Sequence, residues 1–403
     1  MHRPNTLASA KTNELVAGLP VGSLPFGNAK RLLINVNVGW FFISHRMAIA
    51  QAAKAVGFEV HVAADIESDE EISTIADEGI IFHRVSLARG SVNPLLDLRY
   101  LLQIAALIRR IKPHIIHNVT AKPVIYGSVA ARVLRIGHVI NAVAGLGHAF
   151  SGRGRSRILS TLIRSAFRIA MLDPANRVIF QNPDDRNVFL ESRIITADQA
   201  VLIAGSGVDL NAFRFDAELA GTPRVVLPAR MLRDKGIIEF AAAANQLRSR
   251  GCNAEFLLAG RTDENNPTGM KASELGELER TTGVKWLGHV RDMPALYRSA
   301  HVVCLPSYYG EGLPKALIEA CAAGRPIVTT DTPGCREVVT DGINGLIVKP
   351  CDAESLAAAL GRLLGDSDLR SRLGAEGRRR AEHEFDLKSV LKATLDQYRQ
   401  MLG

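Results

Sequence analysis

Two consecutive series of short apolar runs, each run separated from the next by a helical segment, constrain the fold of this chain most. The first series lies at residues 31–38, 58–63, 80–82, 115–117, 139–143 and 178–180, and the second at residues 224–227, 255–258, 302–305 and 327–329. Strands that alternate with helices build a doubly wound parallel sheet. We therefore predict an α/β protein made of two Rossmann-like halves.

The length of the chain supports two domains, because 403 residues exceed what one hydrophobic core usually holds together. We expect a flexible N-terminal extension (1–29), an N-terminal Rossmann-like domain (30–205), a C-terminal Rossmann-like domain (206–385) and a C-terminal helix (386–403) that can return to the first domain. The two domains are expected to face each other across a cleft, where ligands would bind.

Neither a membrane span nor an export signal is evident in the sequence. No run reaches the roughly 18 apolar residues of a spanning helix, and residues 1–29 lack the apolar stretch and cleavage site of a secretory signal. The five cysteines show no metal-ligand spacing and are expected to be reduced. We therefore expect a cytoplasmic protein.

Two helix starts can be read from capping residues. Ser44 is suited to cap a helix that leads to Gly57. Asn182 followed by Pro183 supplies an N-cap and a proline at the first helical position, so a helix is predicted there.

Positive charge is concentrated in the N-terminal half of the chain. The net charge is +8, and residues 201–403 contribute none of it, since they hold 26 basic and 26 acidic residues. Residues 80–172 hold 14 Lys/Arg and a single acid, Asp97. Such a field favours an anionic partner. Nucleic acid is the least favoured one, because the segment lacks interleaved aromatic residues and any recognisable nucleic-acid motif.

The loop after residues 224–227 carries two cations at a strand-to-helix junction. Arg230 and Lys235 are five residues apart, and open parallel sheets bind ligands at the carboxyl ends of their strands. A guanidinium fork together with a point charge suits a diphosphate. From these residues alone, a solvated helix start explains the pattern equally well.

The loop after residues 302–305 is rich in glycine and carries two glutamates. Gly310 and Gly312 permit tight backbone geometry, and Pro314 suits a first helical turn whose free N–H groups can receive phosphate oxygens. Glu311 would face a bound sugar, whereas Glu319 would project from the helix towards ribose hydroxyls. Two glutamates at this spacing are more often surface residues, but Glu319 lies in an apolar stretch, where a carboxylate needs a partner.

These residues resemble glycosyltransferase family 4, a retaining family with the GT-B fold. The matching segments, in the family's order, are Arg230 with Lys235 and Gly236, residues 286–290, 305–307, 311–319, 337–339 and 342–348. The N-terminal half is similar to the subgroup that extends lipid-diphosphate-linked sugars in bacterial polysaccharide or oligosaccharide assembly. Its marks are residues 40–46, 144–150 and 180–186.

The resemblance implies roles for particular residues. Arg230 and Lys235 would bind the donor diphosphate, Glu319 the ribose and Glu311 the transferred sugar. Backbone groups near Gly288 and Val290 are weaker candidates for contacts to the base. The remaining candidates for donor binding are Gly310, Gly312, Leu313, Pro314, Lys315 and Gly39; the family's frequent glycine pair stands here as Gly39 followed by Trp40.

Two histidines of the N-terminal half could contact ligands. His148 follows a strand end and a glycine pair, so it is a candidate catalytic residue that contacts the transferred sugar or the acceptor. His45 is a candidate on the acceptor side. A hydrogen-bonded structural histidine at the first position and helix packing at the second remain open alternatives. Asn182 is better explained as a helix cap than as a ligand.

A basic amphipathic helix is predicted around residues 157–170. At about 100° per residue, Arg157, Arg164 and Arg168 fall on one side and apolar residues on the other. With Arg153 and Arg155 in front of it, the helix suits attachment to an anionic membrane face. A helix that packs its apolar side on the sheet and solvates its arginines is the alternative.

The sequence thus predicts a retaining transferase that moves a hexosyl or N-acetylhexosaminyl group from a nucleotide-sugar, UDP-linked by preference, to a polyprenyl-diphosphate-linked saccharide. Neither a metal nor another cofactor is expected, since cations and a helix start would stabilise the leaving diphosphate. The protein would be peripheral on the inner face of the cell membrane. The alternatives are a nucleotide-sugar epimerase of similar architecture and a non-catalytic nucleotide-sugar-binding, membrane-associated protein.

Overall fold

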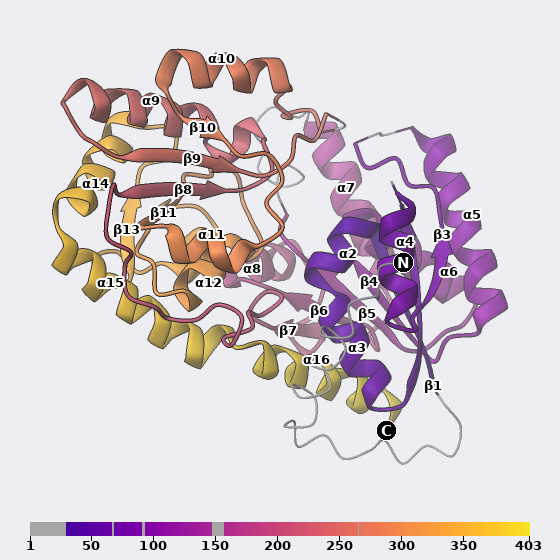
Figure 1. Cartoon of the computed structure of the whole chain (residues 1–403). Coiled ribbons are helices and arrows are strands. Elements are labelled where there is room, and N and C mark those ends of the chain that lie inside the picture. The colour runs from indigo at the N-terminus through magenta and orange to yellow at the C-terminus, as the bar shows by residue number, and fades with distance from the viewer. Residues whose placement is uncertain (1–29, 67, 91–92, 147–156, 265) are drawn as a thin grey trace. The chain divides into compact units, whose positions relative to one another are not determined.

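The computed structural model describes residues 30–66, 68–90, 93–146, 157–264 and 266–403. In the helix that begins at residue 157, side chains are described from residue 160 onward. These residues form two compact units (Figure 1). Unit 1 contains the described residues up to Ser206 together with Lys388–Gly403, and unit 2 is Gly207–Leu387. The last segment of the chain therefore belongs to the same unit as the first.

Unit 1 is built on a seven-stranded parallel sheet with the order β3-β2-β1-β4-β5-β6-β7 (Figure 1). Its strands are β1 (Lys30–Val38), β2 (Phe58–Asp65), β3 (Ile81–Arg84), β4 (Ile115–Val119), β5 (Val139–Val143), β6 (Arg177–Phe180) and β7 (Ala200–Leu202). The order reverses between β1 and β4, which makes this pair the topological switch point of the unit.

The helices of unit 1 cover both faces of this sheet. They are α2 (Gly39–His45), α3 (Met47–Ala55), α4 (Asp69–Asp77), α5 (Pro94–Ile111), α6 (Ala121–Val133), α7 (Arg157–Ala170), α8 (Pro183–Glu191), the 3₁₀ helix η2 (Ala197–Gln199) and α16 (Leu387–Leu402). The predicted cap at Asn182 is confirmed, because its side chain accepts from Asp185 N at 2.7 Å and Pro183 follows at the start of α8. The predicted cap at Ser44 is wrong: α2 begins at Gly39, directly after β1, and Ser44 lies inside it.

A ladder of buried amides crosses the centre of the unit 1 sheet. Asn35, Asn118 and Asn141 are paired in register on β1, β4 and β5, and their side chains are hydrogen-bonded in sequence at 3.0 Å each. Tyr100 of α5 and Ser128 of α6 donate to the two ends of the ladder. Since every amide is buried, a slip of register would leave polar groups unpaired in the core.

Unit 2 is built on a six-stranded parallel sheet with the order β10-β9-β8-β11-β12-β13. Its strands are β8 (Arg224–Pro228), β9 (Glu255–Ala259), β10 (Lys285–Trp286), β11 (Val302–Leu305), β12 (Ile327–Thr330) and β13 (Gly345–Val348). Its helices are η3 (Arg233–Lys235, 3₁₀), α9 (Ile237–Ser249), α10 (Ala272–Thr282), α11 (Met293–Ser299), α12 (Lys315–Ala322), α13 (Cys335–Val338), α14 (Ala353–Gly365), α15 (Ser367–Arg380) and η4 (Ala381–Phe385, π). Its switch point lies between β8 and β11.

The two predicted doubly wound sheets are confirmed, and β5 and β11 have the predicted bounds. The sequence did not predict β7, β10 or β13 as strands. The first two have only three and two residues, too few for an apolar pattern to emerge. Within the ranges that the structure describes, no helix has both the length and the apolar character needed to cross a membrane.

Candidate active site

The predicted donor residues lie at the switch point of unit 2. Arg230 and Lys235 follow β8, and Glu311 follows β11. These two strands are hydrogen-bonded neighbours, so their loops emerge side by side at the carboxyl edge of the sheet. In open α/β sheets, a crevice at this edge is where ligands bind.

Arg230 is held in place by an acid that follows the neighbouring strand β9. Its Nη1 donates to Asp263 Oδ2 at 2.7 Å. The Asp263 side chain is buried, with 9% of its surface exposed, whereas 34% of the Arg230 side chain remains exposed. The guanidinium is thus held by a buried acid, and part of the Arg230 side chain remains accessible.

Lys235 and Glu311 form the closest ion pair of the site. Lys235 Nζ lies 2.5 Å from Glu311 Oε1, and each side chain is 11% exposed. The same ammonium lies 5.6 Å from the centre of the Tyr309 ring, a distance at which the ring face attracts a cation. The structure therefore brings together a predicted diphosphate-binding cation and the predicted sugar-binding carboxylate.

The two loops are locked to each other through Asp234. Its backbone carbonyl accepts from Ser307 Oγ at 3.1 Å, and its carboxylate accepts from Thr268 Oγ1 at 2.9 Å. Gly236, at φ +75°, makes the approach possible, because a Cβ there would lie 2.3 Å from Pro306 O. Lys235 is consequently presented at a fixed position next to the β11 loop.

The glycine-rich loop is positioned by the loop that follows β12. Glu311 N donates to Pro333 O at 3.0 Å, and a Cβ on Gly334 would lie 2.5 Å from Gly312 O. Neither Gly310 nor Gly312 has a positive φ. A left-handed backbone conformation is therefore found at Gly334, where φ is +88°, and the contribution of Gly310 and Gly312 to tight backbone geometry stays a prediction.

The start of α12 carries the end of the predicted motif. Pro314 is the N-cap residue, one position before the predicted first turn, and Lys315 is the first helical residue. Leu313 and Pro314 are buried, so their side chains pack inside unit 2 and hold the loop in position. Their side chains are accordingly supports for the site, and only the backbone of this stretch is suited to contact a ligand.

Glu319 projects from α12 and is almost completely buried, with 6% of its surface exposed. Lys315 Nζ lies 3.5 Å from Glu319 Oε1, one helical turn away. Burial raises the pKa of the Glu319 carboxyl, while Lys315 and the hydroxyl of Tyr297 act in the opposite direction. The carboxyl is a hydrogen-bonding group held out of bulk water, as expected for recognition of hydroxyl groups.

Gly288 and Val290 lie in the segment after β10. Gly288 has a φ of +65° and its carbonyl accepts from Gly260 N at 2.8 Å. Gly260 must be glycine, since a Cβ there would lie 1.7 Å from Ala229 O, and its own carbonyl accepts from Trp286 Nε1 at 2.9 Å. The segment is therefore tied to the start of the Arg230 loop.

The remaining predicted residues belong to unit 1 or lie outside the described residues. Gly39 is the first residue of α2, and a Cβ on it would lie 2.4 Å from Glu71 Oε2. His45 stacks on Phe41 with ring centres 4.3 Å apart, so helix packing accounts for at least part of its role. His148, Arg153 and Arg155 fall outside the described residues.

The arginines of the predicted basic helix lie on α7, whose first residue is Arg157. Arg164 and Arg168 are exposed, and Arg168 Nη2 donates to Ser192 O at 2.7 Å. The apolar residues divide into two groups: Phe167 is buried in the core, whereas Leu162 and Ile169 are 60% and 54% exposed. The helix thus packs one side on the sheet and leaves a second apolar side uncovered within the described part of its unit.

A residue that the sequence analysis missed stands at the switch point of unit 1. Thr120 directly follows β4 and has φ +74° and ψ 161°, a region that is populated almost only by glycine. Its Oγ1 is buried and has no hydrogen-bond partner among the described residues. Such strain at a strand end is typical of ligand-binding positions, but the residue type alone carries no signal of it.

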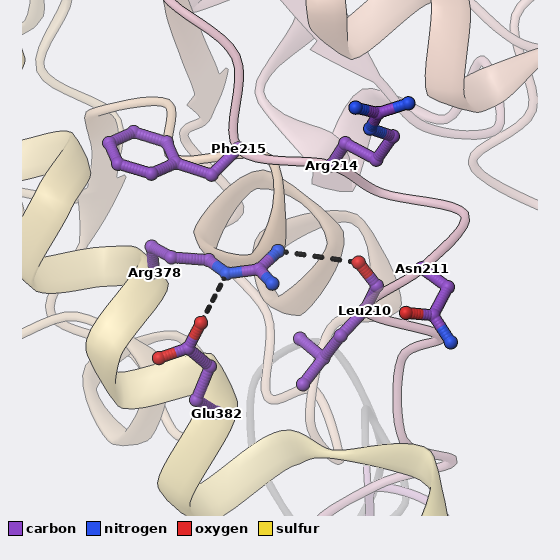
Figure 2. A pocket seen from close by; sticks show the side chains of 6 residues that line it. All are labelled: Leu210, Asn211, Arg214, Phe215, Arg378 and Glu382. Atoms are coloured by element: carbon purple, nitrogen blue, oxygen red, sulfur yellow. Dashed lines mark hydrogen bonds and ion pairs between the residues drawn. The ribbon is translucent and has the colours of Figure 1, made fainter.

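An open cavity of about 570 Å³ lies elsewhere in unit 2. Figure 2 shows the Arg378 guanidinium between the Glu382 carboxylate and the Leu210 carbonyl. Arg378 also donates to Phe213 O at 2.8 Å and Ala322 O at 2.7 Å. Its donors are used to fasten α15 to the rest of the unit, so this cavity is a feature of packing.

Comparison with known families identifies the chain. Residues 31–182 match the family described as "Glycosyl transferase 4-like", and residues 222–366 match "Glycosyl transferases group 1". Together the two matches take in the central parts of both units. The chain belongs to glycosyltransferase family 4. The predicted glycosyltransferase activity is therefore confirmed.

Several characterised glycosyltransferases are similar to this one. The N,N'-diacetylbacillosaminyl-diphospho-undecaprenol alpha-1,3-N-acetylgalactosaminyltransferase of Campylobacter jejuni is 27% identical over 354 residues, which is 82% of this chain and 91% of the relative. The capsular polysaccharide biosynthesis glycosyltransferase CapM of Staphylococcus aureus is 27% identical over 323 residues, or 76% of this chain and 82% of the relative.

Solved structures show the same fold. A sucrose-phosphate synthase from Thermosynechococcus elongatus superposes with a TM-score of 0.75 at 21% identity and covers 93% of this chain and 99% of that chain. HepE of Anabaena, solved with UDP, gives a TM-score of 0.71 at 17% identity and covers 92% of this chain and 100% of that chain. The glycosyltransferase has the GT-B fold, as the sequence predicted.

The sequence analysis missed the acids that hold the cations of the site. Asp263 lies in the loop that follows β9 (Glu255–Ala259), and a charged residue in a loop at the carboxyl end of a buried strand could have indicated it. Asp234 lies between two cations in the β8 loop, where its contacts with Ser307 and Thr268 depend on tertiary structure. No local pattern could have revealed those contacts.

Proposed function

We propose that this glycosyltransferase moves a hexosyl or N-acetylhexosaminyl group, with retention at the anomeric carbon, from a UDP-linked donor to a saccharide carried on a lipid diphosphate. One observation carries the donor part of this proposal. Arg230 and Lys235 are both held by acids in the loop at the switch point of unit 2, and the acid that holds Lys235 is the predicted sugar-binding Glu311. This is the arrangement required to bind a diphosphate next to the hydroxyls of a sugar.

A donor diphosphate would share or replace the carboxylate partners of the two cations. Asp263 and Glu311 now neutralise Arg230 and Lys235, and a diphosphate offers more negative oxygens than either acid. When the phosphate takes over Lys235, the Glu311 carboxylate becomes available to the transferred sugar. The buried carboxyl of Glu319 is suited to hydrogen-bond the ribose hydroxyls.

The chemical step follows from the same charges. As the glycosidic bond to the diphosphate breaks, negative charge develops on the leaving oxygen, and Arg230, Lys235 and the free N–H groups at the start of α12 stabilise it. The leaving phosphate helps to remove the proton of the attacking hydroxyl on the same face of the sugar, so Glu311 does not act as a covalent nucleophile. No divalent metal takes part, which predicts full activity in the presence of EDTA.

The lipid-diphosphate acceptor is supported by two separate observations. The Campylobacter jejuni relative is named for a diphospho-undecaprenol-linked acceptor, and residues 80–172 of this chain hold 14 Lys/Arg against one acid. That single acid, Asp97, lies with its Oδ1 2.6 Å from Lys122 Nζ, and the sequence of the region keeps a large surplus of positive charge. We place acceptor binding in unit 1, with the strained Thr120 as a candidate contact.

Peripheral attachment to the inner face of the cell membrane is supported by exposed apolar side chains on two helices of unit 1. On α5, Leu95 and Leu102 are 74% and 61% exposed, and on α7, Leu162 and Ile169 are exposed together with Arg164. Apolar groups beside arginines are the composition of an interfacial helix. A helix that only solvates its arginines would bury these leucines instead.

Purified protein incubated with a panel of nucleotide-sugars and lipid-diphosphate-linked saccharides tests the proposal. We expect one UDP-sugar to be consumed only when acceptor is present, with the α- or β-configuration of the donor retained in the product. Glu319→Ala should be strongly impaired. Isomerisation of the donor without acceptor would indicate an epimerase, and UDP binding without turnover would indicate a non-catalytic protein; either result contradicts the proposal.

A further inference from the structure

Unit 1 buries an arginine that has no acidic partner in the part of the chain that the structure describes. Arg46 lies at the junction of α2 and α3 and is 7% exposed. Its side chain makes one hydrogen bond to the described residues, from Nη1 to the carbonyl of the adjacent His45 at 3.2 Å. Its Nε is buried and has no partner among those residues. A guanidinium held out of water normally requires a counter-charge.

His117 of β4 is buried beside this arginine, with 2% of its surface exposed. Its Nδ1 lies 2.7 Å from the hydroxyl of Tyr398, on α16. Its Nε2 is buried and has no partner among the described residues. Burial and the neighbouring Arg46 lower the pKa of His117 to about 3, so the ring is neutral at physiological pH.

The hydrogen bond with Tyr398 determines which nitrogen of the neutral His117 ring carries the proton. Burial raises the pKa of the Tyr398 hydroxyl, so the phenol keeps its proton and can donate it to His117 Nδ1. The ring then carries its own proton on Nε2, where it is a free donor. Two buried donors, Arg46 Nε and His117 Nε2, are therefore left without acceptors.

Both residues line the same small cavity. It has a volume of about 20 Å³, and its lining combines apolar residues such as Ile179 and Ile203 with the polar residues His45, Ser206 and Thr394. This is room for a single particle of about the size of a water molecule. A water could accept both hydrogen bonds, but it would leave the charge of the guanidinium uncompensated, because none of the described residues that line the cavity is acidic.

We propose that this cavity binds one small inorganic anion of the size of chloride, held by Arg46 and His117. The volume excludes phosphate, nucleotides and sugars, so the site differs from the donor site of unit 2 and is independent of the proposed function. The ion would join three elements that are distant in sequence: the α2–α3 junction, β4 and, through Tyr398, the C-terminal helix α16. It would act as a structural ion of unit 1.

The test measures the thermal stability of the full-length protein in chloride, bromide and gluconate at equal ionic strength. Gluconate is too large for the cavity. We expect Tm to be higher by roughly 3 °C in either halide and to rise with the logarithm of the halide concentration. Arg46→Gln should remove this dependence, whereas the control Arg99→Gln, at an exposed position on α5, should keep it.

Bromide-soaked crystals of the wild type provide a second readout, which does not depend on the stability of any variant. An anomalous peak between Arg46 Nε and His117 Nε2 is expected. If the Tm of the wild type is the same in all three salts and the cavity shows no anomalous peak, it holds only water and the proposal fails. Halide dependence that persists in Arg46→Gln would also overturn it.

Discussion

The two units differ in whether acidic residues balance their cations. In unit 2 the cations of the site are paired with buried or half-buried acids, Arg230 with Asp263 and Lys235 with Glu311, and residues 201–403 are neutral as a whole. In unit 1, residues 80–172 hold 14 basic residues and one acid, and the buried Arg46 has no acidic partner among the described residues.

This difference corresponds to two ways in which a protein can bind an anion. Paired cations are held rigidly before the ligand arrives, so little reorganisation is needed when a diphosphate takes the place of a carboxylate. A surplus of cations over acids requires an external counter-ion, and its contribution should vary with salt and with the composition of the surface that it contacts. Substitution of the paired cations in unit 2 should therefore affect turnover, and substitution of the cations in unit 1 should affect binding and stability.

The largest effect is expected at Lys235. Replacing Lys235 with Ala removes a charge that stabilises the leaving diphosphate, and kcat/KM should fall by roughly 10²–10³, the loss typical of one such group. The measurement is the initial rate of sugar transfer at limiting donor. Because Glu311 also loses its partner, the donor KM should rise as well.

Arg233 provides the matched control for Lys235. It lies in the same 3₁₀ helix and is also paired with an acid, Glu274, but 46% of its side chain is exposed. Arg233→Ala should change kcat/KM by less than about threefold, as expected for an exposed ion pair. Equal losses in the two variants would mean that the loop needs its overall charge and that Lys235 has no particular role.

The fold was predictable from the sequence because buried parallel strands produce continuous apolar runs, such as residues 139–143 and 302–305. The candidate donor residues could be chosen because they follow such runs, and their role in donor binding stays a prediction. The acids behind them were not, since Asp263 reaches Arg230 only after β8 and β9 have paired. Arg46 likewise looks like a surface residue in the sequence, and its burial depends on the return of α16.

The second effect concerns the buried carboxyl of Glu319. Glu319→Gln keeps the shape but removes a charge-assisted hydrogen bond to the ribose, a loss of about 2 kcal/mol. The donor KM should therefore rise about 30-fold, while kcat should change little because the ribose does not take part in the reaction. A fall in kcat without a change in KM would contradict the assignment to the ribose.

The pH dependence of thermal stability should also depend on the Glu319 carboxyl, and its direction can be stated. Burial raises the pKa of Glu319 in the folded protein, so its contribution to stability is fully present below the unfolded-state pKa and is lost as the pH rises through the folded-state pKa. Glu319→Gln does not undergo this loss. Its Tm relative to wild type should therefore increase from about pH 4 to about pH 8, which thermal unfolding across this range would measure.

A smaller effect is expected from the basic helix of unit 1. Replacing Arg157, Arg164 and Arg168 with Gln should weaken binding to anionic vesicles about tenfold at low salt, less than three fully effective charges would give, because Arg168 already donates to Ser192 O. Vesicle co-sedimentation over a range of salt concentrations measures it. Unchanged binding would refute membrane attachment through α7, and Leu95→Ser with Leu102→Ser would then test α5.

The contact between α16 and the unit 1 sheet should affect stability and leave the chemistry of the donor site unchanged. Tyr398→Phe removes the hydroxyl that donates to His117 Nδ1 and should cost about 1–3 kcal/mol, because a buried nitrogen loses its partner. Thr394→Val, on the same helix, removes a hydroxyl bonded only to the Val390 carbonyl one turn earlier. That carbonyl can keep its helical partner, so the cost should be below about 1 kcal/mol.

The two tryptophans allow these costs to be assigned to one unit. Trp40 lies on α2 in unit 1 and Trp286 on β10 in unit 2, so variants that keep one tryptophan each report urea unfolding of a single unit. In the variant that keeps only Trp40, Tyr398→Phe should lower the midpoint of urea unfolding. In the variant that keeps only Trp286, the same substitution should leave the midpoint close to that of the variant without it. If both shift equally, the units unfold as one, and the difference between them is confined to their charges.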